Sequence, residues 1–115
     1  MTGSGVQRSD FAAIANWIKP EARVLDLGCA DGSLLRYLAE QRGSIGYGVE
    51  IDDDRVHACV SNGVNVIQGD IERRLAEFAD ASFDYVVLSQ TLQAVRSSER
   101  VVREMLRVGR EGIVT

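Results

Sequence analysis

A chain of 115 residues is long enough for one domain and too short for two. Its hydrophobic fraction of 45% suits a globular core, and its net charge of -4 argues against nucleic acid as the main partner. No apolar run approaches the roughly 20 residues that cross a bilayer, and the N-terminus has no signal pattern. We therefore expect a cytoplasmic protein that does not span a membrane, in which Cys29 and Cys59 are free thiols without metal-ligand spacing.

Alternating strand and helix patterns follow along the chain. Residues 1–9 are expected to be a flexible terminus and residues 10–115 one domain, which opens with a helix capped by Asp10 and closed at Pro20. The pattern then predicts, in chain order, a strand at 23–27, a helix at 33–41, a strand at 45–51, a helix at 53–62, a strand at 64–68, a short helix near 75–79, a strand at 83–88, a helix at 97–108 and a strand from 112. This alternation predicts an α/β fold with a Rossmann-like, doubly wound parallel sheet in the order 3-2-1-4-5.

Several side chains have predicted places in this fold. Trp17 lies on the apolar stripe of the first helix and is expected in the core or as a cover over that helix. Val56 and Val60 are expected to point inward from their helix, and Gly109 to follow the last helix as its C′ residue. A third group shares one helical stripe: Val101, Met105 and Val108.

The segment from Val24 to Gly32 carries the strongest functional signal. An apolar strand runs into a glycine-spaced turn, and a helix follows directly. Gly28 has no Cβ, so a ligand can lie against the backbone there, and the first N–H groups of the helix are expected to point toward it. The segment therefore predicts a nucleotide-type cofactor site.

Acidic residues end three successive predicted strands, at Asp26, Glu50 and Asp70. In doubly wound folds an acid about 20 residues beyond the glycine turn accepts the ribose hydroxyls, which is the position of Glu50. Asp70 could accept from the exocyclic amine of a base, or could serve as a cap. Because parallel strands end at one edge of the sheet, we expect the three carboxylates to line that edge.

The spacing Asp26-x-Gly28-x-Ala30-x-Gly32 resembles the first motif of class I S-adenosylmethionine-dependent methyltransferases. Ala30 departs from it, because the family has glycine there, and we expect this methyl group to weaken or displace the cofactor. The resemblance implies that S-adenosylmethionine or S-adenosylhomocysteine is bound by Asp26, Gly28, Cys29, Ala30, Gly32, Glu50, Ile51, Gly69, Asp70, Ile71, Ser89 and Gln90.

A narrower resemblance, to the methionine-biosynthesis MetW family, covers nearly the whole chain. Its most specific segment is the run Ser-Gln-Thr-Leu-Gln at 89–93. It implies a partner role beside homoserine O-acyltransferase, while methyl transfer to an unknown small-molecule acceptor is the alternative and an inactive fold used for association a third. No catalytic residue is assigned, because methyl transfer needs mainly positioning and exclusion of water.

MetW-like proteins are longer than this chain, so the sequence resembles the N-terminal cofactor half of such a protein, without the C-terminal strands. The last strand would then be an exposed sheet edge, which favours pairing with a second copy.

Other polar residues allow a structural and a functional interpretation. Asp31 is interpreted as a helix cap, Cys29 as a small loop residue and His57 as a surface residue, rather than as a ligand contact, a reactive thiol and a base. The acids at 52–54 indicate a solvated helix start rather than a metal site. Residues 89–91 could face the cofactor or cap the next helix. The last set, Arg96, Arg100, Arg103 and Arg107, forms a basic ridge that is either paired with Glu99 and Glu104 or a docking surface.

Overall fold

The computed structural model describes residues 8–89 and 98–115. Its elements are α1 (Arg8–Trp17), β1 (Arg23–Leu27), α2 (Ser33–Arg42), β2 (Ile45–Glu50), α3 (Asp53–Ser61), β3 (Asn65–Gln68), α4 (Ile71–Leu75), β4 (Phe83–Leu88), α5 (Ser98–Val108) and β5 (Gly109–Val114). The five strands form one sheet in the order β3-β2-β1-β4-β5, and every neighbouring pair is parallel. The predicted fold class and strand order are confirmed.

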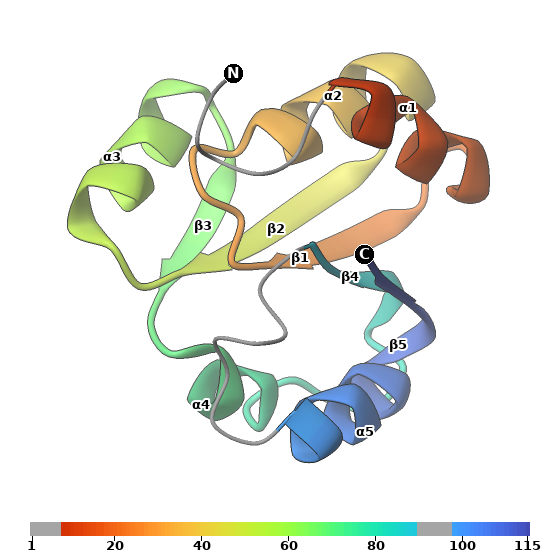
Figure 1. Ribbon diagram of the computed structural model, residues 1–115, viewed down its shortest axis with the longest axis vertical. Helices are drawn as coiled ribbons and strands as arrows, with labels where there is room; N and C mark the ends of the chain where they lie inside the picture. The colour runs from red at the N-terminus through yellow and green to blue at the C-terminus, as the bar shows by residue number, and fades with distance from the viewer. Residues whose placement is uncertain (1–7, 90–97) are drawn as a thin grey trace.

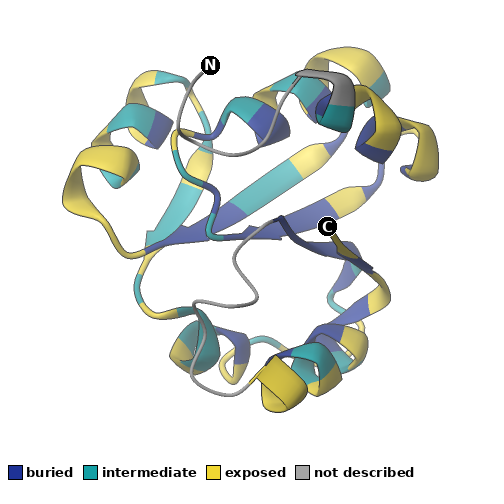
Figure 2. Cartoon of the chain, viewed as in Figure 1, coloured by how far each residue is buried: buried dark blue, intermediate teal, exposed yellow. Residues whose placement is uncertain are grey.

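The sheet separates two layers of helices. Helices α1, α2 and α3 cover one face, and α4 and α5 cover the other (Figure 1). Strand β1 shows the alternation that such a sandwich requires, because Val24 packs with the first layer whereas Leu25 and Leu27 pack with the second. Figure 2 shows that the central strands are buried almost along their whole length, as expected for a parallel sheet covered on both faces.

Helix α5 contributes the predicted stripe of Val101, Met105 and Val108, each no more than 1% exposed. Its Arg107 does not belong to a solvated ridge. The guanidinium pairs with Glu104 and Asp80 and donates to the carbonyl oxygen atoms of Leu75 and Phe78, which ties α5 to the end of α4.

The two other described arginines of the predicted ridge are exposed. Arg103 pairs with Glu99 at 3.5 Å, as expected for a solvated helix face, and Arg100 is exposed. Arg96 lies outside the described residues.

Some local expectations were wrong. Helix α1 begins at Arg8, so Asp10 lies in its first turn and is not the N-cap. Helix α4 begins at Ile71, separated from β3 only by Gly69 and Asp70, rather than near residue 75. Gly109 begins β5 instead of closing α5, because its backbone pairs with Phe83 of β4.

Two large apolar side chains also lie elsewhere than predicted. Trp17 is 69% exposed and Val60 is 65% exposed, whereas Cys59 beside Val60 is fully buried. Val56 is half-buried, so its predicted inward position is confirmed only in part. Helical spacing identified the buried side of α1, where Phe11, Ile14 and Ala15 are buried, but it did not exclude Trp17 from that side or Val60 from the buried side of α3. Within residues 8–89 and 98–115, no helix is long and apolar enough to span a membrane.

Gly48 of β2 gives a direct test of this packing. A Cβ at Gly48 would overlap the Sγ and Cβ atoms of Cys29, so Gly48→Ala should lower the free energy of unfolding by about 1 to 3 kcal/mol. Gly112→Ala in β5 is the matched control, since its Cβ would meet Met105 Cε at an ordinary 3.6 Å. Urea unfolding followed by circular dichroism measures both, and equal stability of the two variants would contradict the packing.

Candidate functional site

The carboxyl ends of β1, β2 and β3 meet at one edge of the sheet. Leu27 is in register with Val49, and Glu50 with Gln68, so the segments after these strands lie next to one another. Asp26, Glu50 and Asp70 therefore occupy neighbouring strand ends, as the sequence predicted. This edge, with the turn between β1 and α2, is the candidate cofactor site.

The glycine spacing of the β1–α2 turn corresponds to its backbone conformation. Gly28, Ala30 and Gly32 all have positive φ angles, of 72°, 53° and 83°. Glycine adopts this left-handed region without steric cost, whereas alanine pays for its Cβ. Gly32 also has no room for a side chain, because a Cβ there would lie 2.8 Å from Val64 Cγ2.

The backbone of this turn is held mainly by bonds within the protein. The N–H groups of Gly28 and Cys29 both donate to the carbonyl oxygen of Val49, at 2.7 and 3.1 Å. The N–H of Gly32 donates to the carbonyl oxygen of Cys29 at 2.9 Å. These three N–H groups precede α2 and are used by β2 and by the turn itself. The sequence expectation concerned the first N–H groups of α2, of which that of Ser33 donates to the Asp31 carboxylate.

Glu50 joins the β1–α2 turn to the segment that follows β2. Its Oε1 accepts the N–H of Ala30 at 2.9 Å, and its Oε2 accepts the N–H groups of Ile51 and Asp52 at 3.0 Å each. The side chain is 4% exposed. Because a carboxylate offers about four acceptor positions, roughly one remains, on Oε1, for a further donor. This structural role of Glu50 was not predicted from the sequence.

Asp26 is the second buried carboxyl group of the site, at 3% exposure. Burial raises the pKa of Asp26 to about 7, and the negative charge of Glu50 contributes to the rise. Among the described residues, none donates a hydrogen bond to the Asp26 carboxyl. A cation placed beside these two groups would offset the cost of their charge.

Asp70 and Ile51 present side chains that are accessible to a ligand. Asp70 occupies the N-cap position of α4, but its side chain accepts no N–H group of that helix, so its exposed carboxylate is available to a ligand. Ile51 follows Glu50 and is 65% exposed, which is high for an apolar side chain. Gly69 connects β3 to α4, and Ile71 packs half-buried against the core on the α4 side.

Ser89 follows the last residue of β4 and is 8% exposed. Its buried Oγ has no hydrogen-bond partner among the described residues, which is unusual for a buried hydroxyl group. Gln90, the other predicted site residue in this segment, lies outside the described residues, as does Thr91.

Three other polar positions have structural roles or are exposed. Asp31 accepts the N–H of Ser33 at 3.0 Å, but the cap position itself is Gly32, so the predicted cap was misplaced by one residue. Asp52 caps α3 by accepting the N–H of Arg55, as predicted for a helix start. His57 is exposed, as predicted.

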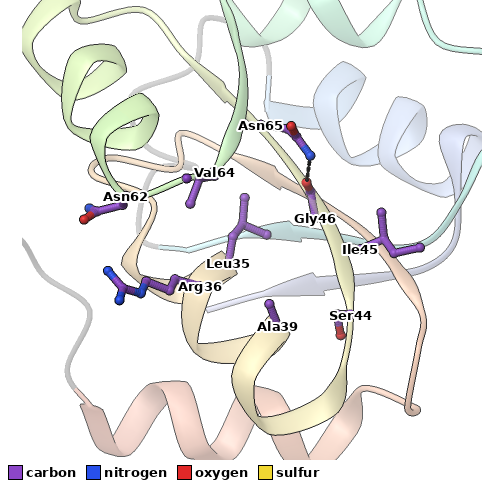
Figure 3. Close-up of a pocket in the computed structure, with 10 residues that line it drawn as sticks. Leu35, Arg36, Ala39, Ser44, Ile45, Gly46, Asn62, Val64 and Asn65 are labelled. Atoms are coloured by element: carbon purple, nitrogen blue, oxygen red, sulfur yellow. Dashed lines mark hydrogen bonds between the residues drawn. The ribbon is translucent and has the colours of Figure 1, made fainter.

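A separate hollow of about 220 Å³ lies at the opposite end of β2 and β3, where these strands begin (Figure 3). Leu35 and Ala39 of α2 line it together with Ser44, Val64 and Asn65. Because none of the predicted site residues contributes to it, this hollow is distinct from the candidate cofactor edge.

Solved structures with the same fold place this domain in a known class. A SAM-dependent methyltransferase from Archaeoglobus fulgidus superimposes with a TM-score of 0.78 at 23% identity, over 88% of this chain and 46% of that one. The YcgJ protein of Bacillus subtilis gives the same TM-score at 22% identity, over 90% and 47%. The domain therefore has the class I methyltransferase fold.

The family follows from the sequence comparison. Residues 8–115 match the model of the methionine biosynthesis protein MetW family, and the chain belongs to that family. The bifunctional methionine biosynthesis protein MetXA/MetW of Rhodopirellula baltica is 37% identical over 114 residues, which cover 92% of this chain and 18% of that protein. Norajmaline N-methyltransferase of Rauvolfia serpentina is 26% identical over 82% of this chain and 34% of its own length. The chain thus spans only 18% and 34% of the lengths of these two relatives.

The raised pKa of Asp26 predicts a pH-dependent stability. In the unfolded chain this carboxyl has its ordinary pKa of about 3.8, and in the folded protein its pKa is about 7. The folded state thus holds the proton more tightly, so the free energy of unfolding should fall as pH rises from about 4 to 7, and then level off. The shift corresponds to a loss of about 4 kcal/mol.

Asp26→Asn removes this titration. The variant should gain stability relative to the wild type across the same pH interval, measured by urea unfolding at several pH values. Asp54→Asn, at an exposed carboxylate of α3, is the control for removal of one negative charge. Parallel curves for the wild type and Asp26→Asn would contradict the role given to burial.

Proposed function

We propose that this domain binds S-adenosylmethionine or S-adenosylhomocysteine at the carboxyl edge of β1, β2 and β3. The observation that carries the proposal is the set of carboxylates at Asp26, Glu50 and Asp70 around a turn with left-handed residues. This acidic edge suits a ligand with a sulfonium and an ammonium group. The fold shared with SAM-dependent methyltransferases supports the same cofactor.

The residues present fit the parts of such a cofactor. Gly28 would allow close approach to the backbone, and the remaining acceptor position of Glu50 would take a ribose hydroxyl. Asp70 would accept from the adenine amine, and the exposed face of Ile51 would pack on the adenine ring. The unpartnered hydroxyl group of Ser89 would gain a partner from the ligand.

Bound S-adenosylmethionine supplies an activated methyl group. The contribution of this chain is to bind, orient and exclude water, and no described residue is assigned as a proton acceptor. Ala30 keeps a methyl group where the motif has glycine, so we expect the cofactor to bind more weakly or to shift at that point.

We further propose that the protein acts beside homoserine O-acyltransferase in methionine biosynthesis. Membership of the MetW family supports the pathway. The Rhodopirellula baltica relative carries MetXA and MetW in one chain, as its name states, and two functions joined in this way favour physical association when they are separate.

Methyl transfer to a small-molecule acceptor is the second candidate function. It is favoured by two relatives that are methyltransferases, norajmaline N-methyltransferase and the sterol 24-C-methyltransferase of Schizosaccharomyces pombe, which is 31% identical over 89% of this chain. Turnover of an acceptor by the full-length protein with bound cofactor would favour this function.

Calorimetric titration with S-adenosylhomocysteine tests the cofactor site. The wild-type protein should show saturable binding, and Asp70→Asn should weaken it about tenfold, because a charged acceptor is replaced by a neutral one. Because the Asp70 carboxylate holds no helix N–H group, this variant should keep the stability of the wild type.

Glu111→Gln is the matched control, since it also converts an exposed carboxylate to an amide but lies on β5, away from the three strand ends. It should bind like the wild type. Equal affinity of Asp70→Asn and Glu111→Gln would remove Asp70 from the site, and no binding by the folded wild type would refute the proposal.

The partner role has a separate assay. Acyl transfer to homoserine by a homoserine O-acyltransferase of the same organism should increase when the full-length protein is added, and the two proteins should elute together in size-exclusion chromatography. Unchanged activity together with separate elution would count against association.

A further inference from the structure

The two cysteines of the chain lie together directly behind the β1–α2 turn. Cys29 belongs to this turn and Cys59 to α3, 30 residues later, yet their Sγ atoms are 3.5 Å apart. Both side chains are buried, at 4% and 0% exposure, and both are free thiols. Cys59 also donates its S–H to the carbonyl oxygen of Ala30 at 3.0 Å.

Two glycines make the space for this pair. A Cβ at Gly48 would overlap Cys29, and a Cβ at Gly32 would lie 3.3 Å from Cys59 Sγ. The sulfur atoms are therefore enclosed by the turn, β2 and α3, and each is the nearest thiol to the other. Such a pair can form a disulfide if the sulfur atoms approach to about 2.05 Å.

We propose that Cys29 and Cys59 are an oxidative modification site, and that their disulfide weakens binding of the cofactor. The effect on the cofactor rests on the function proposed above. The oxidant is a peroxide. One thiol is oxidised by hydrogen peroxide to a sulfenic acid with release of water, and the second thiol then displaces a second water molecule to form the disulfide. Two thiols and one peroxide thus yield one disulfide and two waters.

The contacts of the turn explain the effect. A disulfide has no S–H group, so the carbonyl oxygen of Ala30 loses its donor. The shorter sulfur–sulfur distance also draws Cys29 toward α3. Both changes act on Ala30, which follows Cys29 in the chain and accepts from Cys59. Ala30 has a left-handed φ of 53°, and its N–H donates to Glu50. A shift of Ala30 therefore disturbs the carboxylate that is assigned to the ribose.

Burial makes the reaction slow. Desolvation raises the pKa of Cys29 and of Cys59, so little thiolate is present at neutral pH, and the thiolate is the reactive form. The site therefore responds to sustained oxidation rather than to brief exposure.

The experiment compares the full-length protein after treatment with hydrogen peroxide or with dithiothreitol. Intact mass spectrometry should show the loss of two hydrogen atoms, and a tryptic map should link the peptides of Cys29 and Cys59. Titration with S-adenosylhomocysteine should show affinity about tenfold lower in the oxidised form, the loss of about one hydrogen bond, and dithiothreitol should restore it. Hydrogen exchange of the turn peptide, measured without cofactor, should rise on oxidation.

Cys59→Ser is the control, because its hydroxyl can still donate to Ala30 but cannot form a disulfide; Cys59→Ala serves if the serine variant does not fold. In the control, peroxide should produce no linked peptide pair and should leave the hydrogen exchange of the turn peptide unchanged. Absence of the disulfide in the wild type, or a disulfide with unchanged exchange and affinity, overturns the inference. If the reduced protein binds no cofactor while the disulfide forms and exchange rises, the proposed function fails and the modification site stands.

Discussion

The carboxylate of Glu50 is the interaction on which the candidate site depends. It accepts N–H groups from the β1–α2 turn and from the start of the segment that leads into α3, so one side chain holds two turns together. This is possible because β1 and β2 are neighbours in the sheet and end at the same level. Removal of the carboxylate would leave three backbone donors to be satisfied in another way at a largely buried position.

The same arrangement concentrates negative charge. Asp26 lies buried near Glu50, and its pKa is raised mainly by burial and further by the negative charge of Glu50. No donor pairs with the Asp26 carboxyl among residues 8–89 and 98–115, and a buried ionisable group of this kind is typical of a binding or catalytic site. Binding of a cationic ligand at this edge would offset the repulsion between the Asp26 and Glu50 carboxylates. The proposed ligand would therefore account for two acidic groups being kept at this buried place.

Small residues connect the site to the protein interior. The left-handed turn needs Gly28 and Gly32, while Gly32 and Gly48 also leave the space that the two sulfur atoms fill. Ala30 is the exception in the motif, and it is held from two sides, by Glu50 through its N–H and by Cys59 through its carbonyl oxygen. The shape of the turn therefore depends on contacts with β2 and α3 as much as on its own residues.

The architecture and the position of the acidic edge follow from the sequence. Strand and helix periodicity are local properties, and parallel strands must end at one edge, so Asp26, Glu50 and Asp70 could be placed without coordinates. Contacts between distant residues could not be placed in this way. The bond from Ala30 to Glu50, the meeting of Cys29 with Cys59 and the exposure of Trp17 join or separate elements across the fold. These three features follow from how the helices pack on the sheet, and no local pattern encodes that packing.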